Sequence, residues 1–221
     1  MKININQIYA IIFRYWRQKR FAVFLNKILP TPEMSLLDVG GYPDNWTQYK
    51  PVVKCLDILN LHPIELTKAD RSHYNIRTII GDGCKLDFPN NSYDIVFSNS
   101  VIEHVGSYEN QKAFAGEVRR VGRSLWIQTP AYECFIEPHY LAPFIHWLPK
   151  RWQKKLVRKF TIRGLIDQPT SAEVDNMVES TRLLSFEEVK SLFPDCEILI
   201  EKMLFFIPKS YIAIRKNIVK I

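Results

Sequence analysis

The densest group of reactive side chains lies between residues 132 and 147, around the tetrapeptide Glu137-Pro138-His139-Tyr140. A histidine beside a carboxylate can act as a general base, because the acid orients the imidazole and stabilises its protonated form. We therefore expect His139 to be a general base, with Glu137 orienting it or contacting the substrate. The alternative is a structural segment held by hydrogen bonds and aromatic packing.

The sequence predicts no metal site. Glu137, His139 and His146 lie close in the chain, but their spacing matches no established ligand pattern. The four cysteines are far apart and form no Cys-x-x-Cys pair, which argues against a zinc site and against a disulfide framework. His104 is another histidine near a predicted strand end, and a structural role at the start of the following helix is the simpler interpretation.

A second group of chemically informative residues surrounds the turn Gly40-Gly41, with Asp38 before it and Asp44 after it. A dinucleotide would need a third glycine at this turn and a helix N-terminus free of acids, so that the pyrophosphate can approach. S-adenosylmethionine has no phosphate and carries a cationic sulfonium and a cationic ammonium group. The carboxylates around this turn therefore favour S-adenosylmethionine over a dinucleotide.

Two further acids follow in the expected order. Asp57 comes 19 residues after Asp38, a spacing at which an acid can accept both ribose hydroxyls. Asp82 follows a third apolar run and can accept from the adenine amine, with Gly83 beside it. A single aspartate of this kind is usually a turn former. The ordered set is what carries the inference.

These residues need a sheet that brings them to one edge. Apolar runs at 35–39, 52–56, 78–80, 94–97 and 124–128 predict strands, and residues 109–121 predict a helix between the last two. Strands alternating with helical segments indicate an α/β domain with a parallel, doubly wound sheet. Ligands of such sheets bind beyond the carboxyl ends of the strands, where the glycines and acids above are found.

The flanking segments complete a single domain, 1–221. One or two helices over 7–29 form an N-terminal cap (1–33) on the cofactor-binding core (34–130). Residues 131–184 are too many for an ordinary connection, so we expect a partly helical lid that carries function. In the last part, 185–221, Ser185 and Glu188 form a capping box for a helix to Leu192, before strands at 197–201 and 211–215.

Three segments resemble one known family. They are Leu36-Leu37-Asp38-Val39-Gly40-Gly41, Gly81-Asp82-Gly83, and residues 93–105 with Ser98-Asn99-Ser100 followed by Glu103-His104. Together they resemble the type 11 group of class I S-adenosylmethionine-dependent methyltransferases, over roughly residues 35–130. The resemblance implies a mostly parallel seven-stranded sheet and S-adenosylmethionine as the cofactor.

The resemblance also implies a role for each cofactor-binding residue. Asp38, Gly40 and Gly41 would line the methionine end, Asp57 and Ile58 the ribose, Asp82 and Gly83 the adenine, while Asn99 and Ser100 would close the site. The chain departs from the family at two points. The usual third glycine of the first motif is absent, and Ser100 stands where the family often has an acid.

The net charge of +7 raises the question of an acidic partner. Nucleic acid is not expected, because the sequence lacks the Asn-Pro-Pro-aromatic, Pro-Cys and ribose-methylation patterns. We expect O-methylation of a small-molecule, glycan or lipid-linked acceptor. Residues 14–27 and 150–163 are basic and lack acids; they could contact an anionic carrier or the inner membrane face, or be solvated helix faces.

Two other functions remain open from the sequence. One is a non-catalytic methyltransferase fold that binds a partner, supported by the altered glycine motif. The other is an NAD-dependent oxidoreductase, against which the missing glycine and the nearby carboxylates count. The scattered cysteines and the lack of a secretory n-region at the start predict a cytoplasmic protein. The oligomeric state is not predicted.

Overall fold

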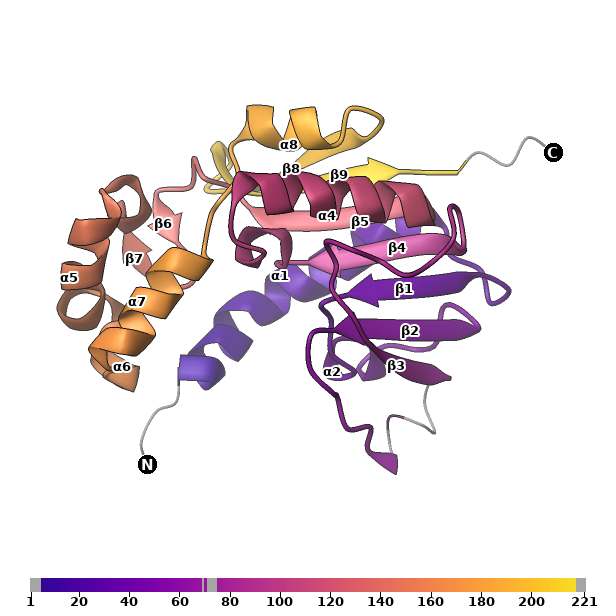
Figure 1. The fold of residues 1–221 in the computed structure, drawn as a ribbon, viewed down its shortest axis with the longest axis horizontal. Coiled ribbons are helices and arrows are strands. Elements are labelled where there is room, and N and C mark those ends of the chain that lie inside the picture. Colours follow the sequence, from indigo (N-terminus) through magenta and orange to yellow (C-terminus); the bar gives the residue numbers. More distant parts are fainter. Residues whose placement is uncertain (1–4, 69, 71–74, 218–221) are drawn as a thin grey trace.

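The computed structural model describes residues 5–68, 70 and 75–217, with the side chains of the first helix described from Tyr15 onward (Figure 1). Seven strands form one sheet in the order β3-β2-β1-β4-β5-β9-β8. The strands are β1 (Ser35–Val39), β2 (Cys55–Asn60), β3 (Ile76–Ile80), β4 (Tyr93–Asn99), β5 (Gly122–Pro130), β8 (Glu197–Met203) and β9 (Ile207–Arg215). β1 to β5 are parallel, while β9 is antiparallel to β5 and to β8.

Helices cover both faces of this sheet. They are α1 (Ile5–Ile28), α2 (Asp44–Thr47), the 3-10 turn η1 (Ile102–His104), α4 (Tyr108–Val121) and α8 (Phe186–Leu192). One core lies against α4 and α8 and includes Phe114, Val118 and Leu192. The other lies against α1 and α2 and includes Phe24 and Trp46. This arrangement confirms the predicted doubly wound α/β class with a seven-stranded, mostly parallel sheet.

The predicted elements at the two ends of the chain form, and the two final strands are longer than predicted. The N-terminal segment is one helix, α1, whose Phe24 and Ile28 are buried against the sheet. Ser185 caps α8 in the expected capping box with Glu188. The final two strands pair through a turn at 204–206, before Pro208 rather than through it.

One strand is displaced from its predicted position. The sequence predicts β2 at 52–56, ending just before Asp57, but β2 spans Cys55–Asn60. Pairing decides this: Leu37 of β1 lies opposite Asp57, and Val39 lies opposite Leu59. Strand register follows the neighbouring strand and the buried apolar face, so the apolar residues after Asp57 extend the strand to Asn60.

The long segment after β5 forms a small unit of its own. It contains the hairpin β6 (Ile136–Glu137) and β7 (Ala142–Pro143), the turn η2 (Ile145–Trp147), and helices α5 (Lys150–Phe160), α6 (Ile162–Asp167) and α7 (Ser171–Ser180). Its core includes Tyr140, Val157 and Val174. Figure 1 shows this unit beside the carboxyl ends of the parallel strands, at the left of the view. None of the described helices combines the length and hydropathy that a membrane crossing needs.

Candidate functional site

The turn after β1 is built around a buried carboxylate. Asp38 is 1% exposed, and its Oδ2 accepts a 2.7 Å hydrogen bond from Nε1 of Trp46. Its other oxygen, Oδ1, is buried without a hydrogen-bond partner among the described residues. A Cβ at Gly41 would overlap this carboxylate, so only glycine lets the turn close over Asp38. Gly40 has φ +79°, a conformation that glycine adopts without steric cost.

The end of β4 lies beside this turn, because β4 pairs with β1. Asn99 is the last residue of β4, and its Oδ1 is also buried with no partner in the described part of the chain. Ser100 has φ +54° and is held on Gln128 of β5, through its backbone N–H (2.9 Å) and its hydroxyl (3.1 Å). The predicted closing residues therefore do lie next to the Gly-Gly turn.

Two unpartnered acceptor oxygens at neighbouring strand ends favour a cationic ligand. Burial raises the pKa of Asp38 to about 7, and the hydrogen bond from Trp46 offsets only part of the increase. A cation beside Asp38 would stabilise the ionised carboxylate. A cavity of about 140 Å³ lies on the α1 side of this region. Trp46, Asn99 and Ser100 line it together with Arg17 and Arg20 of α1, and Asp38 is not among its lining residues.

The structure places Asp57 and Ile58 away from the strand end at which the ribose contacts were predicted. Asp57 lies in the middle of β2 and is 6% exposed; its Oδ1 accepts from Arg77 Nε (3.0 Å) and its Oδ2 accepts from Arg77 Nη2 and the Tyr93 hydroxyl (both 2.5 Å). Ile58 is fully buried in the core beneath α1 and α2. The shift of β2 toward Asn60 removes both residues from the ligand-binding edge.

Asn60 takes the strand-end position that the sequence analysis gave to Asp57. Its Nδ2 donates to the Gly41 carbonyl at 3.3 Å, and its Oδ1 accepts from Leu61 N–H at 2.9 Å. The apolar run through Leu59 is the signal that could have identified it. Trp46 was also missed, and no local pattern marks its contact with Asp38.

The third predicted acid lies where expected, after β3. Asp82 is exposed, and its Oδ1 accepts from Cys84 N–H at 2.8 Å, which shapes the turn. A Cβ at Gly83 would press on Phe114 and Val39, so glycine is needed for the turn to pack against α4. The second carboxylate oxygen of Asp82 is not used in this turn hydrogen bond, and adenine recognition remains a proposal.

The acid–histidine pair forms as the sequence predicts. Glu137 is 1% exposed, and its Oε1 lies 2.6 Å from Nδ1 of His139. Its Oε2 accepts from Tyr140 N–H at 2.7 Å, so both carboxylate oxygens are fixed. Burial by itself would lower the pKa of His139, but the adjacent Glu137 outweighs it and the pKa is raised. His146 lies apart, with Nε2 at 2.9 Å from the Tyr132 carbonyl oxygen.

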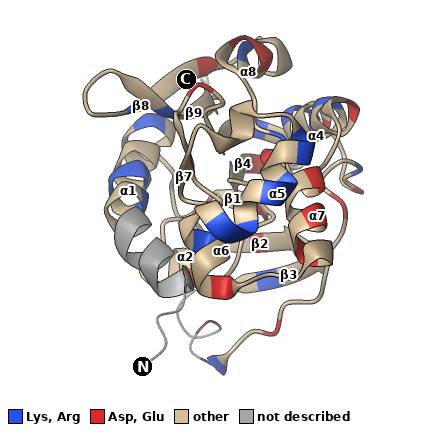
Figure 2. Ribbon diagram, turned by 90° about the vertical axis from the view of Figure 1, so that its left-hand side faces the viewer, with Lys and Arg blue, Asp and Glu red and all other residues tan. Residues whose placement is uncertain are grey.

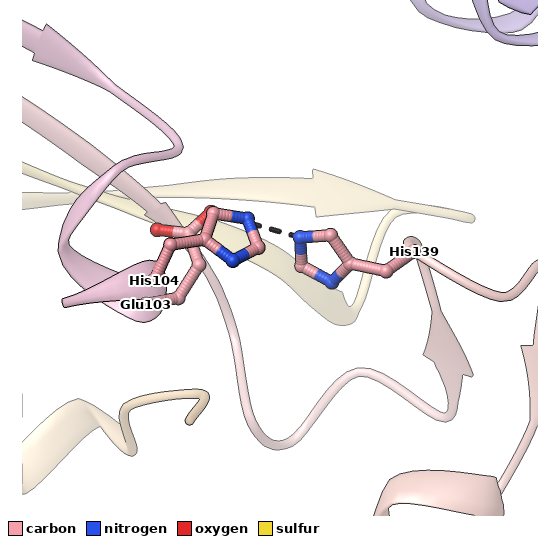
Figure 3. Close-up of side chains that lie close together, drawn as sticks. All are labelled: Glu103, His104 and His139. Carbon is pink, nitrogen blue, oxygen red and sulfur yellow. Dashed lines mark ion pairs between the residues drawn. The ribbon is translucent and has the colours of Figure 1, made fainter. Parts of the chain in front are cut away.

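Two residues of η1, Glu103 and His104, lie beside His139 (Figure 3). Glu103 is fully buried, and burial raises its pKa to about 7. The ring of His104, which is exposed, meets that of His139 edge-on, with centroids 4.7 Å apart. Glu103 had no predicted role, because its place beside His139 depends on how the insertion folds back over η1.

A half-open cleft of about 750 Å³ lies between the insertion and α8. Glu137 and Tyr140 line it on one side and Arg182 on the other, and the Arg182 N–H donates to the Glu103 carbonyl at 2.8 Å. The cleft is large enough for a small organic molecule or a sugar unit. Glu137 therefore borders a space that can admit a second substrate, and His139 lies behind it, outside the residues that line the cleft.

One family model matches part of the chain. Residues 40–124 match the family model described as a methyltransferase domain, of type 11. No curated protein sequence matches the chain.

Solved structures share the fold. A chain of the complex between the Haloferax volcanii Trm112 methyltransferase activator and the putative methyltransferase is 13% identical, with 91% of this chain and 89% of that chain covered and a TM-score of 0.54. The PH0226 protein from Pyrococcus horikoshii OT3 is 12% identical, with 91% of this chain and 89% of that chain covered and a TM-score of 0.56. A putative sarcosine dimethylglycine methyltransferase from Galdieria sulphuraria is 18% identical, with 85% of this chain and 60% of that chain covered and a TM-score of 0.51. At these identities the similarity shows the fold alone.

Proposed function

We propose that this chain, a class I S-adenosylmethionine-dependent methyltransferase of the type 11 group, methylates a hydroxyl group of a small-molecule, glycan or lipid-linked acceptor. The observation that carries the proposal is the Glu137–His139 pair, held at 2.6 Å beside a cleft at the carboxyl edge of the sheet. A hydroxyl needs a base to become a good nucleophile, and this pair supplies one.

The cofactor-binding part of the proposed site lies at the carboxyl ends of β1 and β4. Asp38 and Asn99 would accept from the ammonium group of the methionine moiety through their unpartnered Oδ1 atoms, while Gly40 and Gly41 give the ligand access to the backbone. Asn60, Asp82 and Gly83 lie along the same edge and are our candidates for the ribose and adenine contacts. When bound, S-adenosylmethionine supplies a methyl group on a positively charged sulfur.

The acceptor half rests on the insertion. Glu137 accepts from Nδ1–H of His139 and thereby leaves Nε2 as the proton acceptor. His139 Nε2 takes the hydroxyl proton while the acceptor oxygen forms its bond to the methyl carbon. The methyl–sulfur bond breaks in the same step, and its electron pair stays on sulfur. Glu137 stabilises the imidazolium that results.

The basic helix α5 bears on the kind of acceptor. Its exposed Arg151, Lys155, Arg158 and Lys159 lie on one side of the insertion, with Trp152 half exposed among them. Figure 2 shows α5 at the front of the view, with the positions of its Lys and Arg residues blue along the ribbon. A helix with cations and an exposed tryptophan favours an anionic surface, so we place the acceptor, or the lipid that carries it, at an anionic membrane face.

Helix α1 contributes less to this surface than its sequence predicts. Arg20 is 8% exposed and forms a two-point ion pair with Glu201 of β8 (3.1 and 2.7 Å). Lys27 pairs with Glu197 at 2.8 Å. Both cations stabilise the packing of α1 on the sheet, which leaves α5 as the main basic surface of the proposal.

Calorimetric titration tests the cofactor part of this function. We expect heat with S-adenosylmethionine and with S-adenosylhomocysteine, and none with NAD. Absence of heat with the first two would contradict the proposal, and binding of NAD would favour the oxidoreductase alternative. Methyl transfer from labelled cofactor to a panel of sugars, hydroxylated small molecules and lipid extracts then identifies the acceptor. Loss of transfer in His139→Asn with cofactor affinity retained is the expected signature of a base.

A further inference from the structure

We infer that Glu103, His104 and His139 bind a divalent transition-metal cation on the acceptor side of the site. The three residues come from two separate segments, η1 and the loop after β6. Each offers one ligand atom, and the three atoms lie within 4.8 Å of one another. This set differs from Glu137, His139 and His146, the combination the sequence alone brought forward.

The Glu103 carboxylate is the strongest argument. Its side chain is fully buried, and Thr129 Oγ1 donates to its Oε2 at 3.1 Å. The other oxygen, Oε1, has no hydrogen-bond partner in the described part of the chain and lies 4.0 Å from Nε2 of His139. A buried carboxylate with a bare oxygen is costly unless a cation or a donor satisfies it.

His139 is oriented as a metal-binding histidine would be. Its Nδ1 lies 2.6 Å from Glu137, which accepts the ring N–H and leaves the lone pair on Nε2. That lone pair is on the side of Glu103. Metal-binding histidines commonly donate a hydrogen bond from their second ring N–H to a carboxylate. This hydrogen bond fixes the tautomer and the orientation of the ring.

The ligand types select the kind of cation. Two imidazoles and one carboxylate suit zinc and its first-row neighbours, whereas magnesium and calcium prefer oxygen ligands alone. With bonds of about 2.0–2.2 Å, tetrahedral ligand atoms lie about 3.4 Å from one another, so atoms that are now up to 4.8 Å apart must draw together by as much as about 1.4 Å on binding. Three protein ligands leave at least one coordination position open, which is typical of a catalytic rather than a structural site.

The consequence for the reaction rests on the proposed function. The acceptor hydroxyl would take the open position, and the cation would lower its pKa so that a water molecule removes the proton. The oxygen then bonds to the methyl carbon as the methyl–sulfur bond breaks onto sulfur. Nε2 of His139 cannot bind the cation and take the proton at once. In the metal-loaded protein, His139 is therefore a metal ligand. Coordination of the acceptor hydroxyl to the cation then replaces His139 as the means of activating that hydroxyl.

Metal titration of the full chain, stripped with a chelator, tests the inference without any acceptor. Zn²⁺ is followed by calorimetry and Co²⁺ by its visible absorption. We expect one cation to bind per chain, and Glu103→Gln, His104→Asn and His139→Asn each to weaken binding more than about tenfold. His62→Asn, an exposed histidine outside the cluster, is the matched control and should bind as the parent does.

Each outcome decides one question. Equal Zn²⁺ affinity in the parent and in all three cluster variants, or no binding by the parent, overturns the metal site. His104 is exposed, so His104→Asn keeps the test valid if the buried variants fail to fold. Cofactor titration of the metal-free protein is run in parallel: S-adenosylmethionine binding without Zn²⁺ binding refutes only this inference, and loss of S-adenosylmethionine binding refutes the proposed function.

Discussion

Nε1 of Trp46 donates a 2.7 Å hydrogen bond to Oδ2 of Asp38, and both residues are about 1% exposed. This contact joins α2 to the end of β1 and leaves the second oxygen of Asp38 buried beside Gly41, without a partner in the described structure. The Asp38 carboxylate therefore stabilises the fold through Trp46 and also belongs to the candidate site.

Trp46→Phe should lower the free energy of unfolding more than Trp126→Phe. Both tryptophans are buried in the same core, but Nε1 of Trp126 has no hydrogen-bond partner among the described residues. Both changes remove the same atoms, and only Trp46→Phe also removes a hydrogen bond to a buried carboxylate, which contributes about 1–3 kcal/mol. Urea unfolding at pH 8, where Asp38 is ionised, measures the difference. Equal losses would show that this hydrogen bond does not stabilise the fold.

Asp38→Asn should change how stability depends on pH. Burial raises the pKa of Asp38 from 3.8 to about 7 in the folded protein. Between about pH 4 and pH 7 the unfolded chain loses a proton that the folded chain keeps, so this residue makes stability fall as pH rises, by up to about 1.4 kcal/mol per pH unit. Above pH 7 its contribution is constant.

The measurement is urea unfolding of the parent and of Asp38→Asn across this range. Other titrating groups are common to both proteins, so the difference between the two curves reports Asp38. We expect the difference to grow in favour of the asparagine variant up to about pH 7 and then to level off. A difference that does not depend on pH would contradict a raised pKa at this position.

Asp57→Asn should reduce stability and leave cofactor affinity unchanged. Its carboxylate is held by Arg77 and Tyr93 inside the sheet, and loss of one buried charged partner costs about 1–3 kcal/mol. Asn99→Ala should do the reverse and weaken S-adenosylmethionine binding about tenfold, a change of about 1.4 kcal/mol. Calorimetric titration of both variants, beside urea unfolding, checks the pair. Weakened binding in Asp57→Asn would restore the ribose role that the register of β2 argues against.

Reversing two charges on α5 should abolish binding to anionic vesicles. Arg158 and Lys159 are exposed near the end of this helix, and each basic residue near an anionic membrane contributes about 1 kcal/mol. Sedimentation with phosphatidylcholine vesicles, with and without phosphatidylglycerol, compares the parent with Arg158→Glu/Lys159→Glu. The control, Lys54→Glu/Lys190→Glu, makes the same change in net charge on other exposed elements. Equal binding of the parent to neutral and anionic vesicles would refute the membrane contact.

Much of this molecule follows from local sequence. The alternation of apolar runs with glycine turns determined an α/β sheet, and the capping box at Ser185 and Glu188 determined where α8 begins. Gly40 and Gly41 marked the tight turn after β1, because the conformation of such a turn depends on adjacent residues. Glu137 and His139 are two residues apart, so their contact could also be predicted from the local sequence.

Tertiary structure alone decided the features that depend on residues distant in the chain. The register of β2 on β1 moved Asp57 into the sheet and brought Asn60 to its edge, because strand pairing and burial on both faces outweigh the position of a single acid. The insertion folds back over η1 and so brings His139 to Glu103. No periodicity in the sequence encodes that approach, since it results from packing between elements rather than from the order of residues within one.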